Sequence, residues 1–251
     1  MDLGSTYRFA ADLPGRILRR LSGRNADYRS ILFDELISRL AGAKPRRILE
    51  IGPRDGEDSR RLVTLRPDKF VLVDLPNQQG RIEQWLPTLR DCPAELVIGN
   101  IMYDARFDDM EPFDVVWCTG VLYHNPEQLR FVRQLFDLTA SGGLLILETA
   151  TARRPRTRNE NCVEIWYPPD KAAGRAYHVS ANVTHLPSAR AVYSWMQMIG
   201  FTDIEKSACH RAVGRALAAD RVAYIARRPR NEGQGIYYGH AGHEFPIGRA
   251  R

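Results

Sequence analysis

The chain has 251 residues, of which 44% are apolar, enough for one large α/β domain with a sizeable core or for two small domains. No run approaches the roughly 20 apolar residues of a membrane-spanning helix, and the N-terminal sequence lacks a basic-then-apolar signal pattern, so we expect a cytoplasmic protein that contacts no membrane. The net charge of +6 comes mainly from arginine, which fits an anionic partner such as nucleic acid or a nucleotide, or an arginine-favouring genome.

The four cysteines are widely spaced and form no C-x-x-C pair: Cys92, Cys118, Cys162 and Cys209. This spacing is typical of reduced thiols rather than of a metal site or a disulfide framework. His210 directly follows Cys209, but adjacency alone does not make a site. We therefore predict no bound metal.

The first 44 residues are predicted to form an N-terminal helical segment. Residues 1–25 carry the short apolar pattern of a loose helix, and residues 27–41 carry a clearer one that ends before Pro45. The apolar residues of the second helix fall on one face at 3.6-residue spacing: Ile31, Leu32, Leu36, Ile37 and Leu40.

Short apolar runs rich in β-branched residues then alternate with helical patterns. The runs lie at 46–52, 69–75, 94–99, 113–118, 144–150, 201–207 and 221–228. Their lengths suit buried strands of a parallel sheet. The helical patterns lie at 80–90, at 126–140 with Pro126 in the first turn, and at 187–199, starting at Pro187 and ending before Gly200.

This alternation predicts an α/β domain over residues 45–228: a Rossmann-like, doubly wound, mostly parallel seven-stranded sheet with helices on both faces. A polar, proline-containing insert at 151–186 is expected on the acceptor side of the domain. Residues 229–251 lack periodicity, and we expect a tail that is mobile or becomes ordered on binding.

A turn with two glycines follows the first predicted strand, in Glu50-Ile51-Gly52-Pro53-Arg54-Asp55-Gly56. Such a turn lets the backbone approach a ligand at the carboxyl edge of a sheet. Asp74 ends the second strand, where a carboxylate can accept hydrogen bonds from both ribose hydroxyls of an adenosine group. Each feature alone is often only a turn or a helix cap, but their order and spacing together predict a nucleoside site.

The turn does not fit the dinucleotide pattern G-x-G-x-x-G, because Arg54 and Glu57 stand at its second and third glycine positions. Glu57 and Asp58 would also repel a pyrophosphate at the start of the following helix. S-adenosylmethionine carries no phosphate, and its cationic sulfonium tolerates nearby carboxylates. The acidic loop therefore favours S-adenosylmethionine over NAD or ATP.

The segment ILEIGPRDG resembles motif I of class I methyltransferases, which normally reads E/D-x-G-x-G-x-G, and the resemblance extends over about residues 45–228. It implies an S-adenosylmethionine-dependent methyltransferase. It also implies cofactor contacts from Glu50, Gly52, Arg54, Gly56, Asp74, Leu75, Asn100, Ile101, Thr119 and Tyr123. Arg54 replaces the middle glycine of the motif, so it either contacts the cofactor carboxylate or faces solvent.

Four segments are similar to the bacterial tRNA wobble-uridine carboxymethyltransferases: GVLYHNPEQL, LLILET, NVTHLPSARAVYSWMQMIGFTDI and RVAYIARRP. In those enzymes the positions of Tyr123 and Arg221 hold the extra carboxylate of carboxy-S-adenosylmethionine, as a phenol and a guanidinium can do. Their Trp- and Lys-containing motif before the first strand has no counterpart, since no tryptophan precedes Trp85 and the only early lysine is Lys44. Ordinary methyl transfer is therefore predicted over carboxymethyl transfer.

Methyl transfer from a sulfonium is an in-line displacement, for which the protein mainly supplies alignment and desolvation. Tyr123 and His124 follow the fourth strand, at the edge where an acceptor would meet the sulfonium. His124 is a candidate general base, with capping of the helix at Pro126 as the alternative. Glu148 is a candidate to orient the acceptor, with a cap or a salt bridge as the alternative.

Aromatic residues of the insert, Trp166, Tyr167 and Tyr177, are candidates to stack on a planar acceptor or simply to pack the insert down. With no added RNA-binding domain visible, a small-molecule acceptor is the leading hypothesis. A tRNA-modifying transferase is the second, and its phosphate contacts would come from a run that is otherwise a solvated loop: Arg153, Arg154, Arg156 and Arg158. A non-catalytic S-adenosylmethionine-binding relative is the third, motivated by Arg54. The sequence indicates no oligomeric state.

Overall fold

A computed structural model describes residues 27–89, 92, 94–152, 154, 157, 159–166, 183–212 and 220–230. Several predictions from sequence fall outside these residues: the helix at 1–25, Tyr167 and Tyr177, three arginines of the run at 153–158, and the tail from residue 231 onward. Within the described part, no helix has the length and apolar character needed to cross a bilayer.

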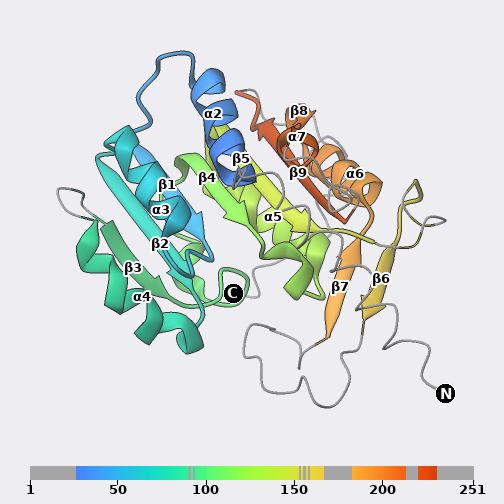
Figure 1. Cartoon of the computed structure of the whole chain (residues 1–251), viewed down its shortest axis with the longest axis horizontal. Coiled ribbons are helices and arrows are strands. Elements are labelled where there is room, and N and C mark those ends of the chain that lie inside the picture. The colour runs from blue at the N-terminus through green and yellow to red at the C-terminus, as the bar shows by residue number, and fades with distance from the viewer. Residues whose placement is uncertain are drawn as a thin grey trace, which may run out of the picture.

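A seven-stranded sheet forms the centre of the molecule, in the order β3-β2-β1-β4-β5-β9-β8 (Figure 1). The strands are β1 (Arg47–Ile51), β2 (Lys69–Asp74), β3 (Ala94–Ile98), β4 (Phe113–Thr119), β5 (Thr139–Ala150), β8 (Thr202–Lys206) and β9 (Arg221–Arg227). The neighbours from β3 to β5 pair in parallel, whereas β9 is antiparallel to both β5 and β8. The predicted mostly parallel, seven-stranded sheet is confirmed.

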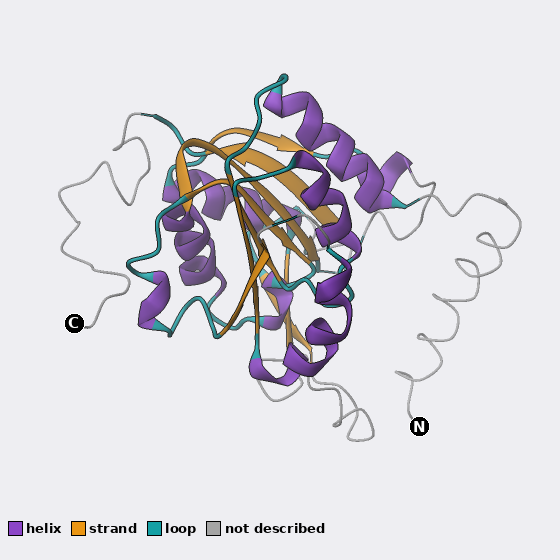
Figure 2. Cartoon of the chain, turned by 90° about the vertical axis from the view of Figure 1, so that its left-hand side faces the viewer, coloured by secondary structure: helices purple, strands orange, loops and turns teal. Residues whose placement is uncertain are grey.

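Helices cover both faces of this sheet (Figure 2). The α-helices are α2 (Tyr28–Leu40), α3 (Glu57–Leu62), α4 (Gln79–Trp85), α5 (Gln128–Leu138), α6 (Ala189–Ile199) and α7 (Cys209–Ala212). Short 3-10 helices span Val63–Leu65, Pro76–Gln78, Leu86–Thr88, Ala105–Phe107 and Leu122–His124. Side chains of α2, α3, α4 and α7 fill one core layer and those of α5 and α6 fill the other, so the predicted double winding is also confirmed.

The two core layers follow from the alternation of side chains along each strand. In β1, Ile48 faces the layer under α2, while Leu49 and Ile51 face the layer under α5. In β4, Trp117 faces the layer under α2 and Val116 faces the layer under α5. Because both faces are buried, the strands read in sequence as continuous apolar runs, which is why their positions could be predicted.

The predicted helix at 187–199 begins two residues later than expected. Ser188 is its N-cap, with an extended backbone and a hydroxyl that accepts a hydrogen bond from the Ala191 N–H at 2.9 Å. Pro187 instead ends β7 (Thr184–Pro187), which pairs antiparallel with β6 (Val163–Trp166) in a small second sheet. The insert therefore contains two strands that the sequence pattern did not indicate.

The boundary between α5 and β5 also differs from the prediction. The helix covers Gln128–Leu138 rather than 126–140, and β5 starts at Thr139 rather than at 144. Thr139 already has an extended backbone, and it pairs with Phe113 ahead of a register shift in the β4–β5 ladder. The first residues of β5 include Gly142 and Gly143, which precede the apolar run. The apolar pattern therefore predicted only the later part of this strand.

The strand order positions the ligand site. The chain winds outward from β1 to β2 and β3, then returns to place β4 on the other side of β1. The loops after β1 and β4 therefore lead to α3 and α5 on opposite faces of the sheet and leave a crevice at its carboxyl edge, the usual ligand position in open α/β sheets.

Candidate functional site

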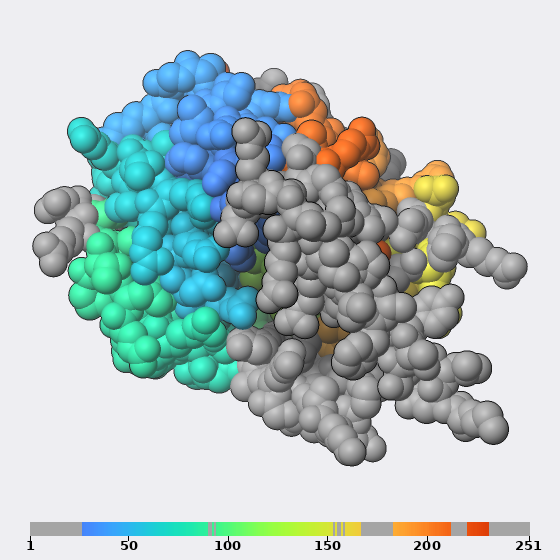
Figure 3. All heavy atoms as spheres, in the orientation of Figure 1, coloured from blue at the N-terminus to red at the C-terminus, as the bar shows by residue number. Residues whose placement is uncertain are grey.

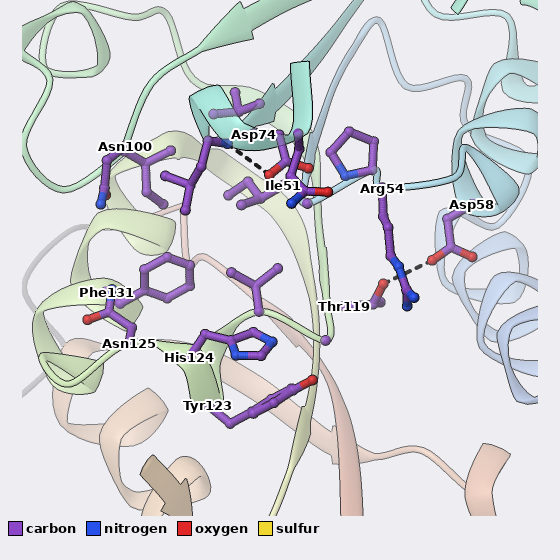
Figure 4. A pocket seen from close by; sticks show the side chains of 18 of the residues that line it. Ile51, Arg54, Asp58, Asp74, Asn100, Thr119, Tyr123, His124, Asn125 and Phe131 are labelled. Atoms are coloured by element: carbon purple, nitrogen blue, oxygen red, sulfur yellow. Dashed lines mark hydrogen bonds between the residues drawn. The ribbon is translucent and has the colours of Figure 1, made fainter. Parts of the chain in front are cut away.

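A cavity of about 650 Å³ opens at this switch point, a size in the usual range for small-molecule sites. It is lined by the loops that follow β1, β2, β3 and β4, with additions from α2, α5 and β9 (Figure 4). Most of the predicted cofactor contacts line it: Gly52, Arg54, Asp74, Leu75, Asn100, Ile101, Thr119 and Tyr123. We call this cavity the switch-point pocket.

Gly52 lets the loops after β1 and β4 approach each other. Its φ of 77° lies in the left-handed region, and its N–H donates to the Val73 carbonyl at 2.9 Å. A Cβ at this position would lie 2.5 Å from the Val121 side chain of the β4 loop. A larger residue at Gly52 would therefore force apart the two loops that form the pocket.

Gly56 and Glu50 are not among the residues that line the switch-point pocket, and their contact with the cofactor stays a prediction. Gly56 is the N-cap of α3, and Trp85 packs where its side chain would be. Glu50 is 2% exposed and accepts a hydrogen bond from the Ser59 hydroxyl at 2.6 Å. Burial, aided by the nearby charge of Asp58, raises the pKa of Glu50 well above its ordinary value. In this structure both residues fix α3 against the sheet.

Gly56→Ala is expected to destabilise the protein by about 1–3 kcal/mol, since alanine is strained at positive φ and meets the Trp85 ring. A Cβ at Gly56 would lie 2.6 Å from that indole, and the φ is 73°. Urea denaturation measures the change. Gly80→Ala is the matched control: Gly80 lies in α4 with open space around its Cβ, so the same substitution should be neutral or stabilising there. Equal effects of the two substitutions would contradict this account of the loop.

Asp74 stands at the middle of the pocket, at the end of β2. Its carboxylate accepts a hydrogen bond from the Leu75 N–H at 2.8 Å, drawn as a dashed line in Figure 4. Burial raises the pKa of Asp74, while hydrogen bonds from the N–H groups of Leu75 and Arg54 act in the opposite direction. A held carboxylate of this kind suits a pair of ribose hydroxyls.

Asn100 and Phe131 lie at one end of the pocket, and Arg54, Thr119 and Asp58 lie at the opposite end (Figure 4). The Asn100 side-chain oxygen accepts a hydrogen bond from the Met102 N–H at 3.0 Å, which fixes the loop after β3. The ring of Phe131, from α5, was not predicted as a site residue. The Phe131 ring therefore offers an apolar face at this end of the pocket.

Asp58 was considered in the sequence only as a group that repels phosphate, yet it lines the pocket. It is 5% exposed, and its carboxylate accepts hydrogen bonds from the Trp117 indole N–H at 3.1 Å and the Thr119 hydroxyl at 2.9 Å. The pKa of Asp58 is raised overall, because the effect of burial exceeds the opposing effect of the ion pair with Arg29. A buried carboxylate therefore stands at the end of the pocket that is farther from Asn100 and Phe131.

Tyr123 and His124 lie together on the floor of the pocket as drawn in Figure 4, with ring centroids 3.9 Å apart. They belong to the 3-10 helix that follows β4. The alternative that His124 caps the next helix is wrong, because the N-cap of α5 is Glu127, whose N–H donates to the Asn125 side chain at 2.8 Å. Both residues line the pocket.

Glu148, which is buried, forms an ion pair with Arg221, as the salt-bridge alternative predicts. Arg221 Nη2 lies 2.8 Å from Glu148 Oε2, and Arg221 Nε donates to the other carboxylate oxygen. Burial would raise the pKa of Glu148, but the Arg221 charge and the hydrogen bonds from Arg221 and His210 lower it to about 2. Arg221 lines the pocket, with its guanidinium carbon 5.7 Å from the Tyr123 ring centroid. Glu148 is not among the residues that line the pocket.

Helix α2 supplies two pocket residues that the sequence analysis missed, Tyr28 and Arg29. The Tyr28 ring packs at a tilt against the ring of His210, with centroids 4.6 Å apart. In Figure 3 the blue surface of α2 accordingly runs between the cyan segment around α3 and the orange segment that includes α7. The amphipathic pattern predicted this helix, but no local signal showed that its first turn reaches the site.

Trp166, predicted to contact the acceptor, lies in the small β6–β7 sheet and is not among the residues that line the pocket. Its partner in that prediction, Tyr167, lies outside the described residues. Among the residues that the structure describes, no three His, Cys, Asp or Glu side chains are grouped as a metal site.

A sequence profile described as a methyltransferase domain matches residues 24–206. The chain belongs to this family of S-adenosylmethionine-dependent methyltransferases. The match includes α2 as well as the loops after β1 to β4, so most of the residues that line the switch-point pocket fall within the family domain.

Two curated relatives are named tRNA U34 carboxymethyltransferase. The protein of Desulforapulum autotrophicum is 28% identical over 181 residues, 72% of this chain and 52% of the relative. That of Vibrio atlanticus is 30% identical over 180 residues, 68% of this chain and 50% of the relative. The chain thus spans about half the length of the curated relatives that it matches.

Solved methyltransferase structures share the fold. The N-terminal domain of EvdMO1, determined in the presence of SAH and D-fucose, superposes with a TM-score of 0.59 at 17% identity, covering 82% of this chain and 84% of that one. The N-methyltransferase NodS from Bradyrhizobium japonicum, in complex with S-adenosylhomocysteine, gives a TM-score of 0.54 at 18% identity, covering 82% and 89%. At this identity the likeness concerns the fold alone.

Proposed function

We propose that the protein transfers a methyl group from S-adenosylmethionine, bound in the switch-point pocket, to a small-molecule acceptor that meets the sulfonium beside Tyr123 and His124. The observation that carries this proposal is the arrangement of the pocket. Its middle holds the Asp74 carboxylate, one end holds Asn100 and Phe131, and the other end holds the buried Asp58 carboxylate.

The proposed cofactor pose follows from this arrangement. Adenine would lie between Ile101 and Phe131, and the ribose hydroxyls would donate to Asp74. The methionine portion would then extend between the β1 loop and Thr119, toward Asp58. The Asp58 carboxylate at this end can accept a hydrogen bond from the ammonium group of the cofactor.

In this pose the acceptor would lie against Tyr123 and His124. Methyl transfer needs little covalent help from the protein, so the two rings would mainly orient the attacking atom and exclude water. We propose His124 as the general base where the acceptor loses a proton on attack. Trp166 and Glu148 are not among the described residues that line the pocket.

The charge balance of the pocket favours ordinary methyl transfer. Arg221 reaches the pocket, but two of its N–H groups bind Glu148, which carries a full negative charge near neutral pH since its pKa is lowered to about 2. The pair is therefore electrically neutral overall. A cofactor with an additional carboxylate would need a stronger net positive site than this pair offers.

Mass spectrometry of small molecules released from the purified, denatured protein tests this choice. Release of S-adenosylmethionine or S-adenosylhomocysteine is the result that we expect. Release of carboxy-S-adenosylmethionine would contradict the proposal of ordinary methyl transfer and would give Arg221 and Tyr123 the role of carboxylate ligands.

A second candidate function, modification of tRNA, is favoured by the names of the curated relatives. Binding to phosphates makes affinity for RNA fall steeply as salt rises. A filter-binding assay with unfractionated tRNA at 25 to 200 mM salt therefore separates the candidates. Strong, salt-sensitive retention would support the tRNA acceptor, and no retention at the lowest salt concentration would exclude it.

A further inference from the structure

Arg54 has a backbone conformation that arginine adopts rarely. Its φ is 49°, in the left-handed region, at the position where the methyltransferase motif ordinarily carries its middle glycine. Glycine adopts this conformation without steric cost, whereas a side chain with a Cβ is strained there. The fold must therefore hold Arg54 in place.

Two hydrogen bonds hold the Arg54 backbone in this conformation. The Trp85 indole N–H donates to the Arg54 carbonyl at 3.0 Å, and the Arg54 N–H donates to the Asp74 carboxylate. Trp85 also packs against the backbone of Gly56, two residues farther along the loop. Strained residues that are held from several sides in this way concentrate at functional sites.

The Arg54 side chain stands at the wall of the pocket and remains exposed to solvent. It lines the cavity, and Figure 4 shows it leaving the β1 loop and pointing toward the end that holds Asp58 and Thr119. In the proposed pose, this is the end that receives the amino-acid portion of the cofactor. The guanidinium therefore stands where that portion would terminate.

Charge selects the ligand group that the guanidinium would meet. S-adenosylmethionine has two cationic groups, the sulfonium and the α-ammonium, and a single anionic group, the α-carboxylate. The carboxylate of Asp58 is already paired with Arg29 and Arg61. A guanidinium at this end is complementary only to the α-carboxylate, which it can bind through two parallel hydrogen bonds.

We propose that Arg54 binds the α-carboxylate of the cofactor and makes the pocket selective for ligands that carry the amino-acid portion. This inference rests on the proposed function of the pocket. It gives the departure from the family glycine a purpose: the loop loses some stability and gains a charged contact.

Isothermal titration with three probes tests the proposal: S-adenosylhomocysteine, its decarboxylated analogue S-adenosyl-3-thiopropylamine, and 5′-methylthioadenosine. In Arg54→Gly, affinity for S-adenosylhomocysteine should fall about 10- to 100-fold, the range for losing hydrogen bonds to a charged group. Affinity for the other two probes should stay within about twofold of the wild type, because neither contains the carboxylate. The Tm of this variant should rise, since glycine relieves the strained φ.

Arg66→Gly is the matched control. Arg66 also has a left-handed φ, 51°, and is exposed like Arg54, but it does not line the pocket. Its replacement should raise the Tm without changing affinity for any of the three probes. Arg54→Lys, which keeps the charge and loses the planar fork, should retain part of the preference for the carboxylate.

An Arg54→Gly variant with the wild-type ratio of affinities for S-adenosylhomocysteine and its decarboxylated analogue would overturn the proposal. A wild type that binds 5′-methylthioadenosine as tightly as S-adenosylhomocysteine would overturn it too, while leaving the nucleoside pocket intact. A wild type that binds none of the probes would overturn the proposed function together with the role of Arg54.

Discussion

Replacing Asp74 with alanine is expected to weaken binding of S-adenosylhomocysteine by about 1–3 kcal/mol, because two ribose hydroxyls lose a charged acceptor. The carboxylate stands at the end of β2 within the pocket, where the Leu75 N–H already fixes its orientation. Affinity for 5′-methylthioadenosine should fall by the same factor, since the ribose is common to both ligands. Isothermal titration measures both affinities.

Asp68→Ala is the matched control for this variant. Asp68 immediately precedes β2, at the opposite edge of the sheet, and its exposed carboxylate bonds to Lys44 and Arg46. Its loss should leave the affinity for both ligands unchanged. An Asp74→Ala variant with wild-type affinity would show that the ribose does not bind at Asp74.

Replacing Arg221 with methionine is expected to lower the free energy of unfolding by about 3–5 kcal/mol, because the variant leaves a buried carboxylate without its main partner. Glu148 is 0% exposed, and the neighbouring group that remains is the His210 imidazole, 3.1 Å away. Urea denaturation at pH 7 gives the value. The double variant Arg221→Met/Glu148→Gln removes the charge as well and should recover part of the loss.

The pH dependence of stability provides a second measure of the same pair. The pKa of Glu148 is lowered from 4.5 to about 2 in the folded protein, so the ionised carboxylate favours the folded state. This contribution is complete above about pH 4.5 and is lost as the pH falls toward 2. The double variant should lack this part of the acid dependence. An Arg221→Met variant that loses less than about 1 kcal/mol would contradict the importance of the ion pair.

The sheet and the first part of the site could be predicted because their signals are local. Strands buried on both faces read as short apolar runs, and Gly52 and Asp74 each follow such a run at the edge where ligands bind. The strands β6 and β7 escaped prediction because each has only four residues, and alternate residues of β6 are exposed. Periodicity cannot separate so short an element from a loop.

The parts of the site that depend on tertiary contacts could not be predicted in the same way. Glu148 and Arg221 are 73 residues apart and meet only because β5 and β9 pair antiparallel. Tyr28 reaches the pocket because α2 packs against α7 through His210. The left-handed conformation of Arg54 was also unexpected, since the sequence shows only that a glycine is replaced.

Titration of the wild-type protein with S-adenosylhomocysteine tests the central claim most directly, because the product of the proposed reaction keeps every part of the cofactor except the transferred methyl group. We predict saturable binding with one site per chain, and no comparable binding of NAD or ATP, whose phosphates the acidic loop disfavours. No binding of S-adenosylhomocysteine, or tighter binding of either phosphorylated nucleotide, would contradict the assignment of the switch-point pocket.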